Sequence, residues 1–158
     1  MLTFLKNPLV HVFLISMVPL IELRGGIIWG AANGLGLWEN MIACIIGNMI
    51  PVPFILLFIR KILELMKKIP KLDKIALWVE AKADKNKDKV TKYATWGLLL
   101  FVGVPLPGTG AWTGALVAAM MNMRMKYALP SILGGVILAS VIMSLGAYGV
   151  VSAFAIFS

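Results

Sequence analysis

The sequence predicts an all-α integral membrane protein with two inverted repeats, each a re-entrant helical hairpin followed by a long transmembrane helix. Three observations carry this prediction. The chain is 60% hydrophobic with a mean hydropathy of +0.91, whereas soluble domains are about 45–50% apolar. Two stretches rich in Pro and Gly interrupt apolar runs about half a chain apart. A long apolar segment follows each of them, so the two halves have the same order of parts.

The first interruption is Pro19-Leu20-Ile21-Glu22-Leu23-Arg24-Gly25-Gly26, which holds the only charges of the apolar run 9–35. Proline removes a backbone donor, and charged side chains are costly in hydrocarbon. The stretch therefore suits two half-helices that meet at a break. We expect helix over residues 11–20 and again from 27 to 32, followed by a turn at Asn33-Gly34-Leu35-Gly36.

Residues 38–69 predict one long helix. At 1.5 Å per residue it would extend about 48 Å, which exceeds a hydrocarbon core of about 30 Å. Pro51 and Pro53 predict a kink within it. Asn48 precedes these prolines, and its amide suits a hydrogen bond between helices, with contact to a substrate as the alternative.

A basic block follows the first long helix. Residues 60–92 contain 11 of the 15 Lys and Arg residues and five of the seven acids of a chain whose net charge is +8. This pattern is typical of a cytoplasmic segment facing the membrane, and we expect no nucleic-acid partner. Residues 70–93 form the predicted linker, with an amphipathic helix over 72–83.

The second half repeats the order of the first. Residues 96–121 are apolar and contain a second break, Pro105-Leu106-Pro107-Gly108-Thr109-Gly110; a charge-free helix over 127–158 follows, with Pro130 in its first turn. Val18-Pro19-Leu20 matches Val104-Pro105-Leu106 at a spacing of 86 residues. We predict a single membrane domain, with repeat 1 over 8–69 and repeat 2 over 94–158.

Counting membrane crossings predicts the topology. A hairpin plus one spanning helix crosses once, so the second half is inverted relative to the first. This arrangement places 13 basic residues in the cytoplasm and one outside, whereas a four-span arrangement places 12 and two. The positive-inside rule favours the first arrangement. We therefore expect a multi-pass plasma-membrane protein with both termini outside.

The two breaks together predict a transport site. Ends of half-helices attract anions, and the forked donors of Arg24 suit phosphate or carboxylate. Glu22 could carry a proton. The alternative is that both charges pair with each other or with the opposite break, only to satisfy the fold. The candidate substrate-binding residues are Glu22, Arg24, Gly25, Gly26, Asn48, Gly108, Thr109, Gly110 and Trp112.

Enzymatic and metal chemistry have little support in the sequence. The single Cys44 and single His11 leave no thiolate or imidazole cluster for a metal ion and no intrachain disulfide. Neither a nucleophile–base pair nor a cofactor motif is present. We expect a protein that is not an enzyme and needs no cofactor or metal.

The motifs Glu22-Leu23-Arg24-Gly25-Gly26 and Pro105-Leu106-Pro107-Gly108-Thr109-Gly110-Ala111-Trp112-Thr113-Gly114 resemble the small multidrug export proteins of bacteria and archaea. That family resembles, more remotely, the DedA/VTT membrane proteins. The resemblance implies paired re-entrant hairpins and movement of a lipid-linked anion such as a polyprenyl phosphate. Glu22 and Arg24 match the family's hairpin motif. DedA proteins place further arginines after the second hairpin, where Arg124 is the nearest counterpart.

Three functions remain open. The first is a transporter of an anionic, lipid-linked substrate, with proton coupling through Glu22. The second is a proton-driven exporter of cationic drugs, in which Trp29 and Trp112 line the path. The third is a membrane assembly factor without transport. Expected partners are membrane lipid and a second copy of the chain, because the uncharged last helix carries glycines that suit close helix packing.

Overall fold

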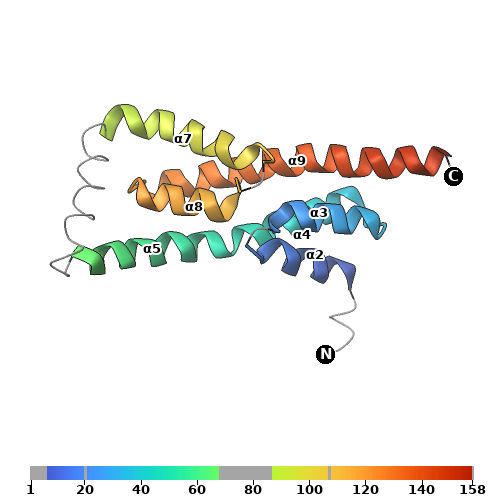
Figure 1. Ribbon diagram of the computed structural model, residues 1–158, viewed down its shortest axis with the longest axis horizontal. Helices are drawn as coiled ribbons and strands as arrows, with labels where there is room; N and C mark the ends of the chain where they lie inside the picture. The colour runs from blue at the N-terminus through green and yellow to red at the C-terminus, as the bar shows by residue number, and fades with distance from the viewer. Residues whose placement is uncertain (1–6, 20, 68–86, 107, 158) are drawn as a thin grey trace.

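Two long helical runs form the frame of the molecule (Figure 1). The computed structural model describes residues 7–19, 21–67, 87–106 and 108–157. Helix α4 (Leu37–Met49) is followed after one residue by α5 (Pro51–Lys67), and α9 (Met125–Phe157) is a single helix of 33 residues. Their apolar spans, 37–59 and 125–153, contain 23 and 29 residues at mean hydropathies of 2.4 and 2.1. Both exceed the roughly 20 residues that cross a bilayer.

Four shorter helices accompany this frame: α2 (Pro8–Met17), α3 (Glu22–Ala32), α7 (Lys87–Gly103) and α8 (Ala111–Met120). Three of them, α2, α3 and α8, contain only 10 or 11 residues. Such helices are about 15–17 Å long. Each is therefore about half as long as the hydrocarbon core is thick.

The short helices pack in two groups at opposite ends of the long axis (Figure 1). Helices α2 and α3 contact each other and α4, while α7 contacts α9 and α8. The inner helix of each group also packs against the long run of the other half, α3 on α9 and α8 on α5. The start of α2 and the end of α9 point to one end of the molecule, and the end of α5 and the start of α7 to the other (Figure 1).

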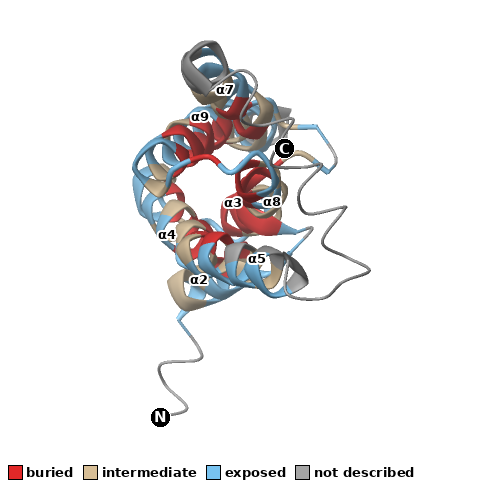
Figure 2. Cartoon of the chain, turned by 90° about the vertical axis from the view of Figure 1, so that its left-hand side faces the viewer, coloured by how far each residue is buried: buried red, intermediate tan, exposed pale blue. Residues whose placement is uncertain are grey.

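The core lies between these helices and contains many small residues. Figure 2 shows buried residues facing inwards around the molecule's long axis. Helix α8 buries an almost unbroken small-residue face against its neighbours: Ala111, Gly114, Ala115, Ala118 and Ala119. A methyl group on Gly114 would collide with Val102 of α7, and one on Gly47 would collide with the backbone of Phe13. Small residues thus permit close helix packing.

The first break is shorter than the sequence predicts. Helix α3 begins at Glu22, five residues before the expected start at 27. The backbone remains hydrogen-bonded across this stretch, since the Glu22 N–H donates to Val18 O and the Gly25 N–H to Ile21 O. Gly25 and Gly26 therefore lie inside a helix. Their missing side chains make room for neighbours: Ile21 at Gly25, and Ser16 with Cys44 at Gly26.

Other boundaries also differ from expectation. The interruption expected at Pro51 and Pro53 lies at residue 50, directly before the first proline. Helix α9 begins at Met125, two residues earlier than expected, so Pro130 lies inside the helix and not in its first turn. The predicted turn at 33–36 is confirmed. The predicted amphipathic helix over 72–83 lies outside the described residues.

Candidate functional site

The two breaks meet, and the Arg24 side chain of the first break hydrogen-bonds to the second. Its Nη1 donates to Leu106 O at 2.7 Å, and its Nη2 donates to Thr109 Oγ1 at 3.1 Å and to Thr109 O. Nη2 also lies 3.4 Å from Val104 O. These carbonyls follow the last residue of α7, where a helix end carries partial negative charge. The guanidinium therefore holds the turn that follows α7 with charge-assisted hydrogen bonds.

Glu22 occupies the complementary position at the start of α8. Its side chain is buried, with 4% of its surface exposed, and Oε1 accepts a hydrogen bond from the Trp112 N–H at 3.2 Å. The N-terminus of a helix carries partial positive charge, which favours a carboxylate there. Gly110 precedes α8, and a methyl group on it would overlap the Glu22 carboxylate. Glycine is thus required at this position for the carboxylate to reach the helix.

Each charge of the first break therefore satisfies backbone groups of the second. This is the pairing with the opposite break that the sequence left open as a structural alternative. These bonds and the close approach at Gly110 bring together five of the nine candidate residues: Glu22, Arg24, Thr109, Gly110 and Trp112. Whether they also bind a substrate stays a prediction.

The backbone of both breaks is held in restricted conformations. Glu22 has a φ of 52° and Gly108 a φ of 82°. Residues with side chains rarely adopt this left-handed region, which glycine enters freely. The Thr109 hydroxyl lies 2.8 Å from Val104 O and 2.9 Å from Leu106 O, closing the second break into a compact turn. The backbone geometry is therefore restricted in both breaks.

Outside the turn of the second break, the remaining candidates are Gly25, Gly26 and Asn48. Gly25 and Gly26 sit in the first turns of α3 and serve close packing. The indole Nε1 of Trp112 and the Nε of Arg24 are buried and have no hydrogen-bond partner among the described residues. The same holds for both amide atoms of Asn48, which is fully buried on α4. The centre thus contains polar atoms that the described part of the fold does not satisfy.

A second polar contact was not predicted from the sequence. The Asn40 amide donates to Ile27 O at 3.0 Å and to the Tyr148 hydroxyl at 3.1 Å. The Tyr148 hydroxyl in turn lies 2.8 Å from Leu35 O. These bonds join α3, α4 and α9. The available signal was an amide at position 40 in an apolar run, which needs a partner in a buried setting.

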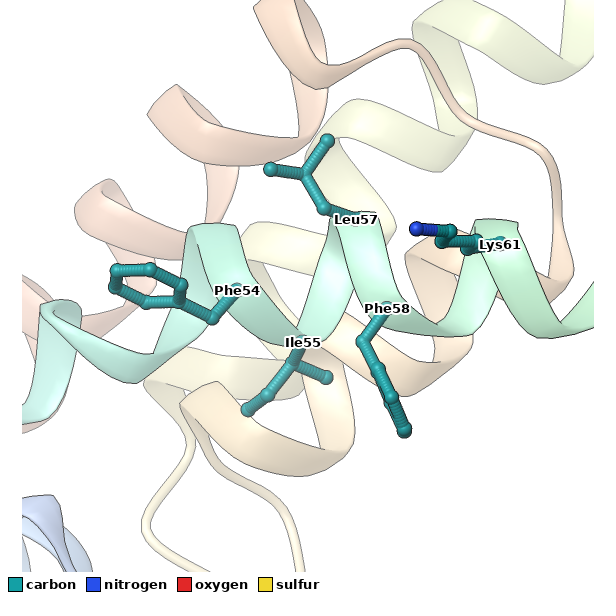
Figure 3. A pocket seen from close by; sticks show the side chains of 5 residues that line it. All are labelled: Phe54, Ile55, Leu57, Phe58 and Lys61. Atoms are coloured by element: carbon teal, nitrogen blue, oxygen red, sulfur yellow. The ribbon is translucent and has the colours of Figure 1, made fainter.

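An apolar groove of about 460 Å³ lies along α5. Figure 3 shows its lining side chains, all from this helix: Phe54, Ile55, Leu57, Phe58 and Lys61. The apolar span that includes α5 ends at residue 59. The Lys61 ammonium therefore stands just beyond the apolar part of the helix.

Metal binding has no evident centre in the described part of the chain, where no group of three His, Cys, Asp or Glu residues lies close enough to hold an ion.

One family matches this chain. The sequence profile described as "Putative small multi-drug export protein" matches residues 22–142, which include both breaks and most of the two long runs. Comparison with curated proteins gives no match, and neither does comparison with solved structures. The family and the two long apolar helices indicate a membrane export protein. Because the match covers most of its length, the chain belongs to the small multi-drug export protein family.

Proposed function

We propose that the protein exports an amphiphile with an anionic headgroup, bound where the two breaks meet. The observation that carries this proposal is the surplus of buried donors there. Arg24 Nε and Trp112 Nε1 have no partner in the described residues, and both belong to side chains that bond across the breaks or lie beside those bonds. A buried donor without an acceptor is costly. An oxyanion would supply acceptors for both donors and balance the charge of Arg24.

The protein would bind this headgroup inside an inverted repeat. Helix α3 packs on α9 and helix α8 packs on α5, so a short helix of each half contacts the long helix of the other half. This packing supports the arrangement, as does the shortness of α2, α3 and α8. We infer that α2–α3 and α7–α8 are re-entrant hairpins whose tips meet near the middle of the plasma membrane. The start of α2 and the end of α9 would then face outside.

Glu22 would couple export to protons. The Glu22 carboxylate and an anionic headgroup favour the same feature, the positive end of α8. Protonation would remove the carboxylate's charge and weaken its hold on the Trp112 N–H. The substrate anion would then replace Glu22 at this helix end. Deprotonation would reverse the exchange and release the substrate.

The groove on α5 supports an amphiphile over a small soluble anion. Its walls are apolar along the segment that would lie in hydrocarbon, and Lys61 stands at its end. An acyl or polyprenyl chain fits the apolar part, and an anionic headgroup fits the ammonium. Helix α5 also packs against α8, the helix whose N-terminus Glu22 caps. The groove therefore lies on a direct neighbour of α8.

Export of cationic drugs is the second candidate, and the family description favours it. In that case Glu22 would leave α8 and pair with the cation, while Trp29 and Trp112 would contact its apolar parts. Arg24 would then serve only the fold.

Reconstitution into liposomes tests the two candidates directly. We expect a fluorescent polyprenyl phosphate to cross faster in the presence of the protein, and a cationic dye to show no such effect. Arg24→Lys should abolish this movement, because one ammonium cannot replace a fork that reaches both Leu106 and Thr109. Lys126→Arg, a charge-preserving change at an exposed residue outside the breaks, is the control and should retain it.

The opposite pattern would refute the proposal. Movement of the dye alone, lost in Glu22→Gln and retained in Arg24→Lys, would establish cationic drug export. Movement of neither probe by a folded protein would favour the assembly factor.

A further inference from the structure

We propose that the Asn48 amide is a second binding group of the central site and takes a hydroxyl of the substrate headgroup. This inference rests on the proposed function and deepens it by naming a chemical feature of the substrate. It starts from one observation. Asn48 is 0% exposed, and neither its Nδ2 nor its Oδ1 has a hydrogen-bond partner among the described residues.

Asn40 provides the contrast within the same helix. It is equally buried, yet it donates to Ile27 O and Tyr148, and its Oδ1 accepts from the Cys44 thiol at 3.4 Å. The fold therefore satisfies one asparagine of α4 completely and leaves the other, two turns later, without protein partners in its described part. Buried amides are normally bonded, so the difference calls for a ligand at Asn48.

The pairing of α3 with α4 places Asn48 beside the charged centre. Gly30 abuts Asn40, and Gly26 abuts Cys44, so each step of four residues along α4 corresponds to four residues back along α3. The next step pairs Asn48 with Glu22, the first residue of α3. Asn48 thus lies at the level where the carboxylate reaches α8.

Helix α9 approaches the same level from the other side. Asn40 bonds Tyr148, and α4 and α9 run in opposite directions (Figure 1). Two turns along α4 and two turns back along α9 bring Asn48 level with Ser140, a fully buried serine whose hydroxyl donates to Ile137 O at 2.7 Å. The Ser140 hydroxyl donates within its own helix, so its hydrogen is not available to Asn48. The Asn48 amide is therefore the group at this level that can still bind a ligand.

The chemistry of an amide specifies its ligand. Asn48 offers an N–H₂ donor and a carbonyl acceptor, so both are satisfied only by a group that donates and accepts. A hydroxyl does both, whereas a bare phosphate or carboxylate oxygen only accepts. With Arg24 holding the anion, the site therefore fits a headgroup that carries a hydroxyl close to its negative charge.

Two lipids test this inference because they differ only in their headgroup hydroxyls. Fluorescent phosphatidylglycerol and phosphatidylpropanol carry the same charge on a phosphodiester and the same number of headgroup carbons, and only the first has headgroup hydroxyls. In liposomes we expect the parent protein to move phosphatidylglycerol about 2–10-fold faster than phosphatidylpropanol, the range for one net hydrogen bond. Asn48→Leu should remove this preference.

Thermal unfolding of the same variants separates binding from folding. Asn48→Leu removes a buried amide without partners, so its melting temperature should equal the parent's or rise by about 2–4 °C. Asn40→Leu, the matched control, breaks three bonds and should melt lower. A melting temperature of Asn48→Leu as low as that of Asn40→Leu would overturn the inference, because the amide would then be bonded within the fold.

Transport distinguishes the remaining outcomes. If Asn48→Leu keeps the preference for phosphatidylglycerol while Arg24→Lys stops both lipids, the inference fails and the proposed function stands. If the parent moves neither lipid and no polyprenyl phosphate, both fail.

Discussion

Replacing Gly110 by alanine tests the contact on which the centre depends. The Gly110 backbone is extended, with φ −173° and ψ −170°, a conformation that alanine adopts without strain. The only obstacle is steric, because the new methyl group would occupy the position of the Glu22 carboxylate. Glu22 must then leave the start of α8.

The expected cost follows from the lost interactions. A hydrogen bond to a charged group contributes about 1.5–3 kcal/mol, and a carboxylate at a helix N-terminus adds about 0.5–2 kcal/mol. Gly110→Ala should therefore destabilise the protein by about 2–5 kcal/mol. In a chain of this size, this corresponds to a melting temperature lowered by roughly 5–15 °C.

A thiol-reactive dye provides the assay. Cys44 is the chain's single cysteine and is buried, so its reaction with the dye reports unfolding. Gly97→Ala is the control, since nothing lies within 4 Å of a methyl group there and alanine stabilises helices relative to glycine. In a Glu22→Ala background Gly110→Ala should cost almost nothing. An unchanged cost in that background would refute the steric reasoning.

Two further predictions concern the rest of the fold. Tyr148→Phe removes the hydroxyl that bonds Leu35 O and Asn40, and should lower stability by about 1–3 kcal/mol in the same dye assay; an unchanged melting temperature would mean that these bonds contribute nothing net. In a cysteine-free Cys44→Ala background, cysteines at Asn7 and Ser152 should both react with an impermeant thiol reagent added outside intact cells; labelling of only one of them would exclude the inverted repeat.

The charged break was recognisable from the sequence because an acid and a base beside a proline are rare in an apolar run. Its partner was recognisable from the repeated Val-Pro-Leu. The structure confirms that Arg24 meets the second break. The start of α3 was misplaced because Gly25 and Gly26 read as helix breakers, whereas they serve close packing against Ile21, Ser16 and Cys44.

The partner of each charge could not be derived from local sequence. The rule that acids favour helix N-termini applies to Glu22, but using it requires knowing which helix end approaches Glu22 and which carbonyls approach Arg24. That depends on contacts 80 to 90 residues apart in the chain. The pairing of Asn40 with Tyr148 could not be predicted for the same reason, because the two residues are 108 positions apart in the chain.

The bonds of Glu22 and Arg24 to the second break have a consequence for biosynthesis. Glu22 and Arg24 leave the ribosome 80 to 90 residues before the backbone groups that they satisfy. Until α7 and α8 follow, the first half holds a buried acid and base without these partners, a costly state in a lipid environment. In the re-entrant arrangement that we propose, the first hairpin would therefore reach its final depth only after the second has been made. A chain that stops after α5 would keep Glu22 and Arg24 without these partners, and the membrane's quality-control proteases would meet it in that state.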